Sequence, residues 1–222
     1  MTDPREFVDL TQMLDEGSLS YPGTMSGIAL ERVDSGIPEV TLTHLAHLDM
    51  HCGTHLDAPL HFIPTGCDVT AIPLGLPEIV LVRSQERQIP LQSLRGLPSL
   101  RGKAVLFTTG WEQHAGTASY FSGFPSLCPE LAAALVDRGA SVVGIDSPSV
   151  DPASGPFAAH RLLLGGGIPI LEGLVQLEVL SERLAAGRTA RLIAFPLRIR
   201  SLDGSPVRAV AWLTRRTVPS PS

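Results

Sequence analysis

The stretch HCGTHLDAPLH at residues 51–61 gathers three histidines and one aspartate into eleven positions. Histidine is the commonest metal ligand among protein side chains, and aspartate adds a hard oxygen donor, so the stretch indicates a coordination shell. The alternative is a polar loop in which the histidines have no joint role. We favour a metal site, because a loop would rarely collect these donors by chance. The four donors are His51, His55, Asp57 and His61.

The spacing of these donors indicates an extended chain rather than a helix. In a helix of about 3.6 residues per turn the first two donors and the last two would lie on different faces, and Pro59 would interrupt the helix. In an extended chain all four point to one side. A straight strand would, however, place residues 51 and 61 roughly 33 Å apart, too far to bind the same ions through bonds of about 2 Å. We therefore expect the chain to bend at Gly53 and near Pro59.

Length and composition indicate one globular domain over residues 1–222. Of these residues, 44% are hydrophobic and 18% are charged, which provides enough apolar material for a substantial core. The net charge is −5, and the lysines and arginines form no run. This charge pattern argues against nucleic acid or a membrane surface as the main partner. We expect a small-molecule substrate instead.

The sequence predicts a cytoplasmic protein with reduced cysteines. The first ten residues, MTDPREFVDL, lack the apolar segment of a signal peptide, and no apolar run approaches about 18 residues. The three cysteines are odd in number and show no CxxC spacing. Cys52 points away from the donor side of the extended chain, so we interpret it as a buried structural residue.

Hydrophobic periodicity predicts a compact α/β domain in which helices flank a mixed sheet. Strands are expected at 28–33, 40–50, 79–82, 104–107, 141–145 and 168–172. Proline and glycine punctuation predicts helices at 129–138 and from about 157 to the glycines at 165–167. Towards the C-terminus, a hairpin of 192–199 and 207–213 is expected around an Asp203-Gly204 turn.

A second set of donors is expected from the C-terminal half of the chain. Glu172 ends an otherwise apolar strand, and a partly buried carboxylate needs a cation or several hydrogen bonds. His160 would by itself be interpreted as an exposed helix residue, but beside the first cluster it becomes a candidate ligand. Asp49 has the same parity as His51, so we expect its carboxylate to orient that imidazole.

Three motifs carry a resemblance to a known family. The first is HxGTHxDAPxH at 51–61, the second is GIDSPSVDP at 144–152, and the third combines His160 with LEGL at 171–174. Together they resemble the cyclase family, which includes bacterial kynurenine formamidases and isatin hydrolases. The likeness runs from VDLTQ near the start of the chain to GSPVRAVA near its end.

The resemblance implies a metal-dependent hydrolase of amide or related acyl bonds. It also implies a fold of the swivelling β/β/α type and a homo-oligomer, either a dimer or a tetramer. The implied cofactor is two zinc ions, although some relatives use one manganese ion. In this implied arrangement, carboxylates bridge the first zinc ion to the second. The residues at matching positions are His51, His55 and Asp57 for the first zinc, Asp57, Glu172 and His160 for the second, and His61 for the catalytic acid/base.

The donor set fits hydrolysis on chemical grounds as well. One or two divalent ions lower the pKa of bound water and polarise a carbonyl group. The leaving nitrogen then needs a proton, and histidine can move one because its ordinary pKa lies near neutrality. His61 is the candidate for this step, with a role as a metal ligand as the alternative. A serine or cysteine hydrolase is disfavoured, since GxSxG is absent and Cys52 points away from the donors.

The substrate region departs from the formamidase pattern. Those enzymes carry a WPGD segment near the N-terminus, where this chain has YPGT at 21–24. Tyr21 keeps an aromatic surface, so it is a candidate to bind a ring-containing acyl substrate. Such substrates include N-formyl aryl amines, lactams such as isatin, and lactones. Further aromatic candidates for the pocket are Phe62, Trp111, Tyr120 and Phe121.

Two alternatives stay open at this level. The same metal site could serve a cyclase or a lactone hydrolase. A non-catalytic scaffold could instead hold a structural metal. Structural zinc sites are usually closed shells rich in cysteine, however, and no cysteine shares the donor side of this stretch.

Overall fold

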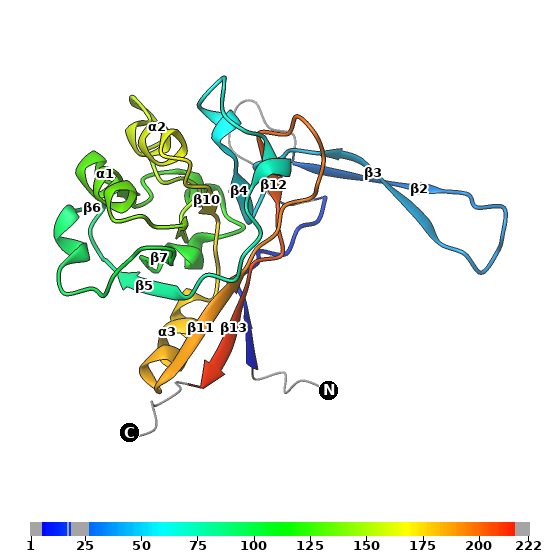
Figure 1. Ribbon diagram of the computed structural model, residues 1–222. Helices are drawn as coiled ribbons and strands as arrows, with labels where there is room; N and C mark the ends of the chain where they lie inside the picture. The colour runs from blue at the N-terminus through cyan, green and yellow to red at the C-terminus, as the bar shows by residue number, and fades with distance from the viewer. Residues whose placement is uncertain (1–5, 17, 19–26, 216–222) are drawn as a thin grey trace.

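A mixed six-stranded sheet forms the centre of the fold in a computed structural model that describes residues 6–16, 18 and 27–215 (Figure 1). The strand order is β12-β4-β10-β9-β7-β5. The last four strands are parallel, whereas β4 runs antiparallel to both of its neighbours. In the same order, the strands span Gly204–Pro206, His55–Asp57, Ile170–Glu172, Val142–Ile145, Ala104–Thr108 and Ile79–Arg83.

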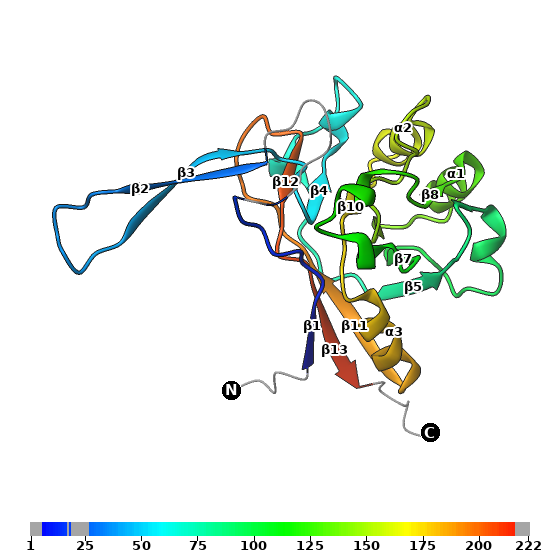
Figure 2. The same ribbon diagram turned by 180° about the vertical axis from the view of Figure 1, so that it is seen from behind.

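Each face of this sheet carries its own hydrophobic core. Helices α1 (Pro129–Asp137) and α2 (Ala158–Gly165) cover one face, where they pack on inward-facing side chains such as Val143 and Ile170. On the other face lie α3 (Leu177–Ala185) and a second, antiparallel sheet in the order β1-β13-β11 (Figure 2). The strands of this second sheet span Phe7–Asp9, Val210–Arg215 and Arg188–Ile193. A small parallel pair consists of β6 (Gln88–Ile89) and β8 (Ser126–Leu127).

The expected α/β fold with a mixed sheet and flanking helices is confirmed. Most predicted elements differ from the observed ones by at most two residues at their ends, but the strands expected at 192–199 and 207–213 are observed at Arg188–Ile193 (β11) and Val210–Arg215 (β13). Helix α1 starts at the proline that the sequence singles out, and Cys128 before it accepts a hydrogen bond from Leu131 N through its sulfur. Cys52 is fully buried, in line with its interpretation as a structural residue.

The prediction of a C-terminal hairpin is wrong about the turn that joins the two strands. Strands β11 and β13 do pair, but the segment between them does not close in a tight turn at Asp203-Gly204. Instead, residues 204–206 leave as β12 and pair with β4, and Ala58 N donates to the carbonyl oxygen of Asp203 at 2.8 Å. The long connection is favoured because the edge of β4 would otherwise keep unpaired backbone groups. It brings Asp203 beside the donor segment.

An antiparallel pair of strands, β2 (Ile28–Val33) and β3 (Leu42–Leu48), forms an arm that projects from the body of the molecule (Figures 1 and 2). The two strands are those expected at 28–33 and 40–50, the second being shorter at both ends. Within the described part of the chain, no helix is long and apolar enough to cross a membrane.

Candidate metal centre

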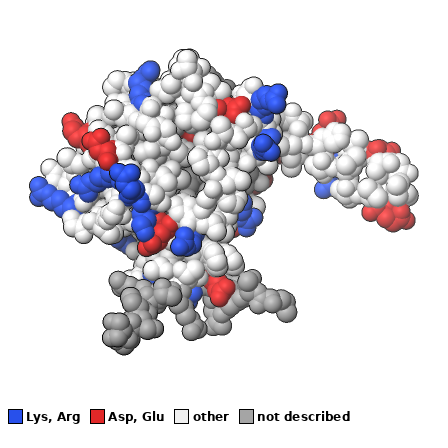
Figure 3. All heavy atoms as spheres, in the orientation of Figure 1, with Lys and Arg blue, Asp and Glu red and all other residues white. Residues whose placement is uncertain are grey.

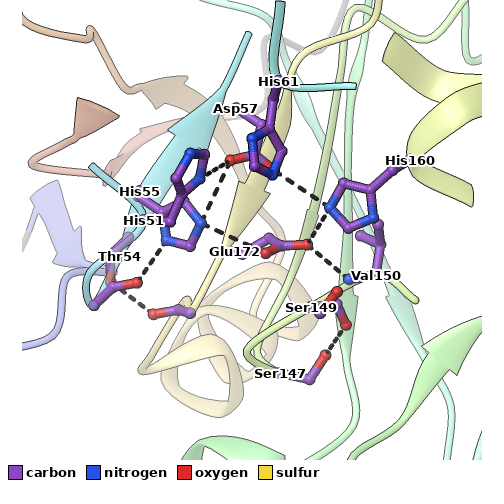
Figure 4. A network of polar contacts seen from close by, with 12 residues as sticks. His51, Thr54, His55, Asp57, His61, Ser147, Ser149, Val150, His160 and Glu172 are labelled. Carbon is purple, nitrogen blue, oxygen red and sulfur yellow. Dashed lines mark hydrogen bonds and ion pairs between the residues drawn. The ribbon is translucent and has the colours of Figure 1, made fainter. Parts of the chain in front are cut away.

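The donor segment bends where its glycine and proline stand. Gly53 has φ +61°, a left-handed conformation that glycine adopts without a steric cost. The chain then enters the short strand β4, and Pro59 starts a single turn of 3-10 helix that ends at His61. The two bends draw the ends of the segment together, so that the four donors face a common point (Figure 4).

The distant donors reach the same point from two other elements. Glu172 ends β10, where it pairs directly with His55 of β4, and paired residues in adjacent strands place their side chains on the same face. His160 lies on α2, which covers that face, and only 3% of it is exposed. The structure therefore brings together all six residues that the sequence suggests for the metal and the acid/base (Figure 4).

Two carboxylates each span two imidazoles. Asp57 places Oδ1 3.4 Å from His55 Nε2 and Oδ2 3.5 Å from His160 Nε2. Glu172 places Oε2 3.5 Å from His55 Nε2 and Oε1 3.3 Å from His160 Nε2. Each carboxylate thus offers one oxygen to each histidine. This is the donor arrangement that carboxylates bridging two ions require.

The outer nitrogens of both histidines are fixed by other groups. His55 Nδ1 lies 2.9 Å from the carbonyl oxygen of Gly53, which accepts its proton. His160 Nδ1 lies 2.8 Å from Asp151 Oδ2. Each ring is thereby held with Nε2 directed at the carboxylates, as is usual for metal-ligating histidines. Asp151 belongs to the GIDSPSVDP motif, but its contact with His160 was not foreseen from the sequence.

His51 lies between two carboxylates. Its Nδ1 is 2.8 Å from Asp57 Oδ1, and its Nε2 is 3.0 Å from Asp203 Oδ2. The prediction that Asp49 orients this ring is wrong. Asp49 stands at the base of the arm, where it accepts a hydrogen bond from Gly27 N at 2.5 Å and contacts His47.

His61 shares Asp203 with His51. Its Nδ1 lies 2.9 Å from Asp203 Oδ2, and its ring centroid lies 4.0 Å from that of His51. One nitrogen of His61 also falls within 4.8 Å of donor atoms of His51 and Asp57. This proximity suits both a proton carrier beside the ions and the alternative of a further ligand.

The charges of the cluster stabilise one another. Burial alone would lower the pKa of His51, but the charge of Asp57 and the hydrogen bonds to Asp203 and Asp57 outweigh it and raise the pKa to about 10. Burial of Asp57 acts to raise the pKa of its carboxyl, yet the histidines around it hold that pKa well below its ordinary value. Hydrogen bonds from His51 and His61 lower the pKa of Asp203. These pKa shifts favour a proton on His51 beside the ionised carboxylates of Asp57 and Asp203.

The cluster fits divalent metal ions. Oδ2 of the fully buried Asp57 is the one buried side-chain polar atom among the described residues that lacks a hydrogen-bond partner. Such an atom is costly unless a cation meets it. Two donors on one tetrahedral ion with bonds of about 2.0–2.1 Å lie about 3.3 Å apart, close to the spacing of the histidine nitrogens and carboxylate oxygens here. Imidazole and carboxylate donors suit zinc and also manganese.

A cavity of about 150 Å³ opens beside the cluster. Two aromatic rings form one wall: Phe62 stacks on His160 with centroids 4.6 Å apart, and Phe157 lies 5.7 Å from Phe62. Of the four aromatic candidates proposed from the sequence, Phe62 alone lines this cavity, whereas Tyr120 and Phe121 line a different one. Phe157 was not foreseen. Tyr21 lies outside the described residues.

Comparison with known proteins assigns the chain to a family. The model of the Cyclase family matches residues 8–152, which is more than half of the chain and includes the donor segment. The chain belongs to the Cyclase family. This membership confirms the resemblance that the sequence motifs indicate.

Solved structures share the fold of this cyclase-family protein over nearly its whole length. Isatin hydrolase A from Labrenzia aggregata, bound to benzyl benzoate, is 26% identical, with 95% of this chain and 94% of that chain covered at a TM-score of 0.77. Isatin hydrolase A from Ralstonia solanacearum is 25% identical, with coverages of 94% and 92% and a TM-score of 0.77. A "predicted metal-dependent hydrolase" from Bacillus stearothermophilus is 25% identical, with coverages of 92% and 97% and a TM-score of 0.75.

Proposed function

We propose that this protein is a metal-dependent hydrolase of an amide, formamide or cyclic amide bond. The observation that carries the proposal is the pair of carboxylates, Asp57 and Glu172, which each present one oxygen to His55 and the other to His160. The fold shared with isatin hydrolases supports the same reaction class.

The residues that would hold two zinc ions are those of the cluster, with manganese as the alternative metal. His51, His55 and Asp57 would form one shell, and Asp57, Glu172 and His160 the other. When bound, such ions lower the pKa of water and polarise the carbonyl group of a substrate. The protein supplies the orientation of the donors, since Gly53 O and Asp151 fix the imidazoles that face the carboxylates.

His61 would move the proton. Its Nδ1 is held by Asp203, so Nε2 is the nitrogen that can exchange a proton with a reacting group. It would accept a proton from water during attack and return it to the leaving nitrogen, which needs one because an amine anion is a poor leaving group. Asp203 would favour the tautomer with the proton on Nδ1 and stabilise the positive ring after proton uptake.

The cavity walls support a substrate with a flat ring. Phe62 and Phe157 offer aromatic surface, and the Cζ atom of Arg161 lies 5.6 Å from the centroid of the Phe62 ring. An aryl formamide or a fused lactam would place its ring against these side chains and its carbonyl group towards the carboxylates. Lactones and a cyclase reaction would use the same groups, and they form the nearest alternatives.

The decisive experiment is a substrate screen on protein stripped of metal and then reloaded with zinc or manganese. Matched N-formyl aryl amines, lactams and lactones would be offered to each form. We expect turnover of a formamide or lactam that disappears on stripping and returns on reloading. Lactone turnover alone would favour the lactonase alternative. Tight metal binding without turnover of any of these substrates would support a non-catalytic scaffold and contradict the proposal.

A further inference from the structure

The VDLTQ segment at residues 8–12 lies outside the candidate metal centre, although it is part of the family resemblance. Its backbone is held from two sides. Leu10 N donates to the carbonyl oxygen of Ala209 at 2.8 Å, and Leu10 O accepts from Val175 N at 3.1 Å. The segment ends at Gln12, whose backbone and side chain both contact residues that neighbour the proposed metal ligands.

Thr54 and Gly173 stand where the pairing of β4 with β10 stops. The last pair of this ladder is His55 with Glu172, so Thr54 and Gly173 occupy the next position. Gly173 N donates to the carbonyl oxygen of Ser147 at 3.0 Å, outside this ladder. The Thr54 hydroxyl connects the two strands instead, because Oγ1 donates to Gly173 O at 2.6 Å. One side-chain bond thus joins β4 to β10 directly beside two proposed ligands.

Gln12 contacts both partners of this bond. Its backbone N donates to Thr54 Oγ1 at 2.9 Å, and its side-chain Nε2 donates to Gly173 O at 2.9 Å. A backbone N–H can only donate and a carbonyl oxygen can only accept, so the Thr54 proton points to Gly173 O and the amide group of Gln12 faces the same oxygen. Each bond in this group therefore has one possible direction.

Tyr120 fixes the orientation of the Gln12 amide. Its hydroxyl lies 3.2 Å from Gln12 Nε2 and donates to the carbonyl oxygen of Asp146 at 3.1 Å. Because the hydroxyl proton is directed at Asp146, the hydroxyl oxygen accepts the second N–H of the amide. Burial raises the pKa of Tyr120 and keeps the hydroxyl protonated.

The network formed by Gln12, Thr54, Tyr120 and Gly173 consists of neutral groups. On the face shown in Figure 3, the side chains of Lys, Arg, Asp and Glu lie scattered over the surface. Thr54 and Tyr120 are instead 1% and 4% exposed, and their bonds join uncharged atoms. Such bonds stay the same over the pH range in which imidazoles titrate. The network is therefore suited to hold a fixed geometry.

We propose that Gln12 is a positioning residue for the metal centre and acts through Thr54 and Gly173. Thr54 precedes His55 and Gly173 follows Glu172, so a shift of either neighbour moves a proposed ligand. His55 Nε2 lies 3.5 Å from Glu172 Oε2, and the bonds of Gln12 hold the two strands at this spacing. The inference rests on the proposed function, because it requires that the cluster binds the metal.

Removing the Thr54 hydroxyl tests this junction in the full-length protein. Thr54→Val keeps the shape of the side chain but cannot donate to Gly173 O, so zinc affinity should fall about 10- to 100-fold, the range for residues that orient ligands. Thr54→Ser restores the hydroxyl and should bind zinc nearly as tightly as the parent protein. Thr108→Val is the matched control, since Thr108 is also buried but its hydroxyl donates to Glu178. It should leave zinc affinity unchanged.

Gln12→Met tests the side-chain contact separately. The variant keeps the length of the side chain and the backbone donor to Thr54, but it removes the amide that faces Gly173 O. We expect zinc affinity to fall by about 10-fold. Gln113→Met, at an exposed glutamine, is the control. Zinc affinities would be measured by competition with a chelating dye, with circular dichroism to verify folding.

Unchanged zinc affinity in Gln12→Met would overturn the positioning role, and this variant decides alone if Thr54→Val does not fold. Equal losses in Thr54→Val and Thr108→Val, or no recovery in Thr54→Ser, would also overturn it, because the loss would then follow from general destabilisation. A parent protein that binds no zinc would overturn both the metal centre and this role. Zinc binding with the expected losses, but without hydrolysis of any substrate, would support the positioning role and contradict the proposed function alone.

Discussion

Asp203 Oδ2 lies 2.9 Å from His61 Nδ1, although 142 positions separate the two residues in the sequence. The contact depends on the pairing of β12 with β4, which places Asp203 above the start of the 3-10 helix that carries His61. The same oxygen also meets His51 Nε2 at 3.0 Å. One carboxylate thus holds both the proposed proton carrier and a proposed metal ligand.

Replacing Asp203 should separate orientation from metal binding. In Asp203→Asn the negative charge is lost while the size of the side chain is kept, so His61 loses the partner that stabilises its positive form. At saturating metal we expect kcat to fall about 10- to 100-fold, the range for groups that orient catalytic or ligating histidines, with KM nearly unchanged. Steady-state kinetics over a metal titration would measure kcat and KM at saturating metal.

Asp49→Asn is the matched control for this variant. Asp49 is the acidic residue that sequence parity favours as the orienting group, but the structure places it at the base of the arm. Its replacement should leave kcat within about two-fold of the parent value, because it touches none of the proposed catalytic groups. An equal fall of kcat in the two variants would mean that Asp203 does not specifically orient His61.

The sequence predicted the metal donors of this site better than the residues that orient them. Ligand chemistry restricts residue types, so His51, His55 and Asp57 could be recognised in one short stretch, and a buried carboxylate such as Glu172 called for a cation. Asp203 was missed because an Asp-Gly pair is also the ordinary signal of a hairpin turn. Its actual place follows from long-range strand pairing, which no local pattern encodes.

The arm shows a similar limit. Alternation of apolar and polar residues predicted both of its strands, since strand formation follows local pattern and turn residues. The pattern assumes, however, that one face of a strand is covered by the rest of the chain. In this protein Leu30, Leu42 and Leu45 of β2 and β3 stay exposed, and only the structure reveals it.

Gly173 offers a test of how the backbone holds the ligands. It has φ +67°, and a Cβ atom at this position would lie 2.5 Å from the carbonyl oxygen of Gly53, which accepts the proton of His55 Nδ1. Gly173→Ala should therefore move the His55 ring and weaken metal binding by about 10-fold or more. Metal affinity would be measured by competition with a chelating dye.

Gly96→Ala controls for backbone strain in that experiment. Gly96 has φ +72°, yet a Cβ atom there meets nothing within 4 Å. Both substitutions should lower the free energy of unfolding by about 1–2 kcal/mol through the left-handed backbone. Gly173→Ala should lower it further because of the clash. Metal affinity reduced equally in both variants would show that the Gly53 contact does not support the site.

Stability of the metal-free protein should fall as the pH rises above neutrality. The pKa of His51 is raised from 6.5 to about 10 in the folded protein, and that of His160 is raised as well. Between pH 6.5 and about 10 the folded protein keeps a proton on His51 that the unfolded chain has released. Each proton kept in this way lowers the free energy of unfolding by about 1.4 kcal/mol for every pH unit of increase. Metal loading should abolish this slope, because ligating imidazoles are deprotonated.

Urea denaturation at pH 7.0, 7.5 and 8.0 would measure the slope in both forms. This range ends below the ordinary pKa of cysteine, about 8.5, so Cys52 contributes less to the slope than the histidines do. A metal-free protein whose stability is constant or rises over this range would contradict the charge balance described for the cluster. The same slope in the metal-loaded form would show that the histidines keep their protons and do not bind metal.

Asp57→Asn should remove metal and activity together. In Asp57 one carboxylate oxygen faces His55 and the other faces His160. The asparagine amide has no negatively charged oxygen for either side, so each proposed ion loses a ligand. We expect at least half of the bound metal to be lost and activity to fall by more than about 100-fold, beyond the effect of an orienting residue. Asp137→Asn on the exposed end of α1 is the control. Full metal retention in Asp57→Asn, measured by elemental analysis, would rule out the two-ion site.

His61→Ala separates holding a metal from moving a proton. If His61 is the acid/base, the variant should keep its metal and lose on the order of 10² to 10⁴ in turnover of an amide, the usual range for such a group. The loss should be smaller on a matched aryl ester, because a phenoxide leaves with less help from a proton than an amine anion does. Turnover of both substrates and metal content would be measured side by side. Equal losses on the two substrates, or metal content that falls in step with the rate, would identify His61 as a ligand and place the proton carrier elsewhere.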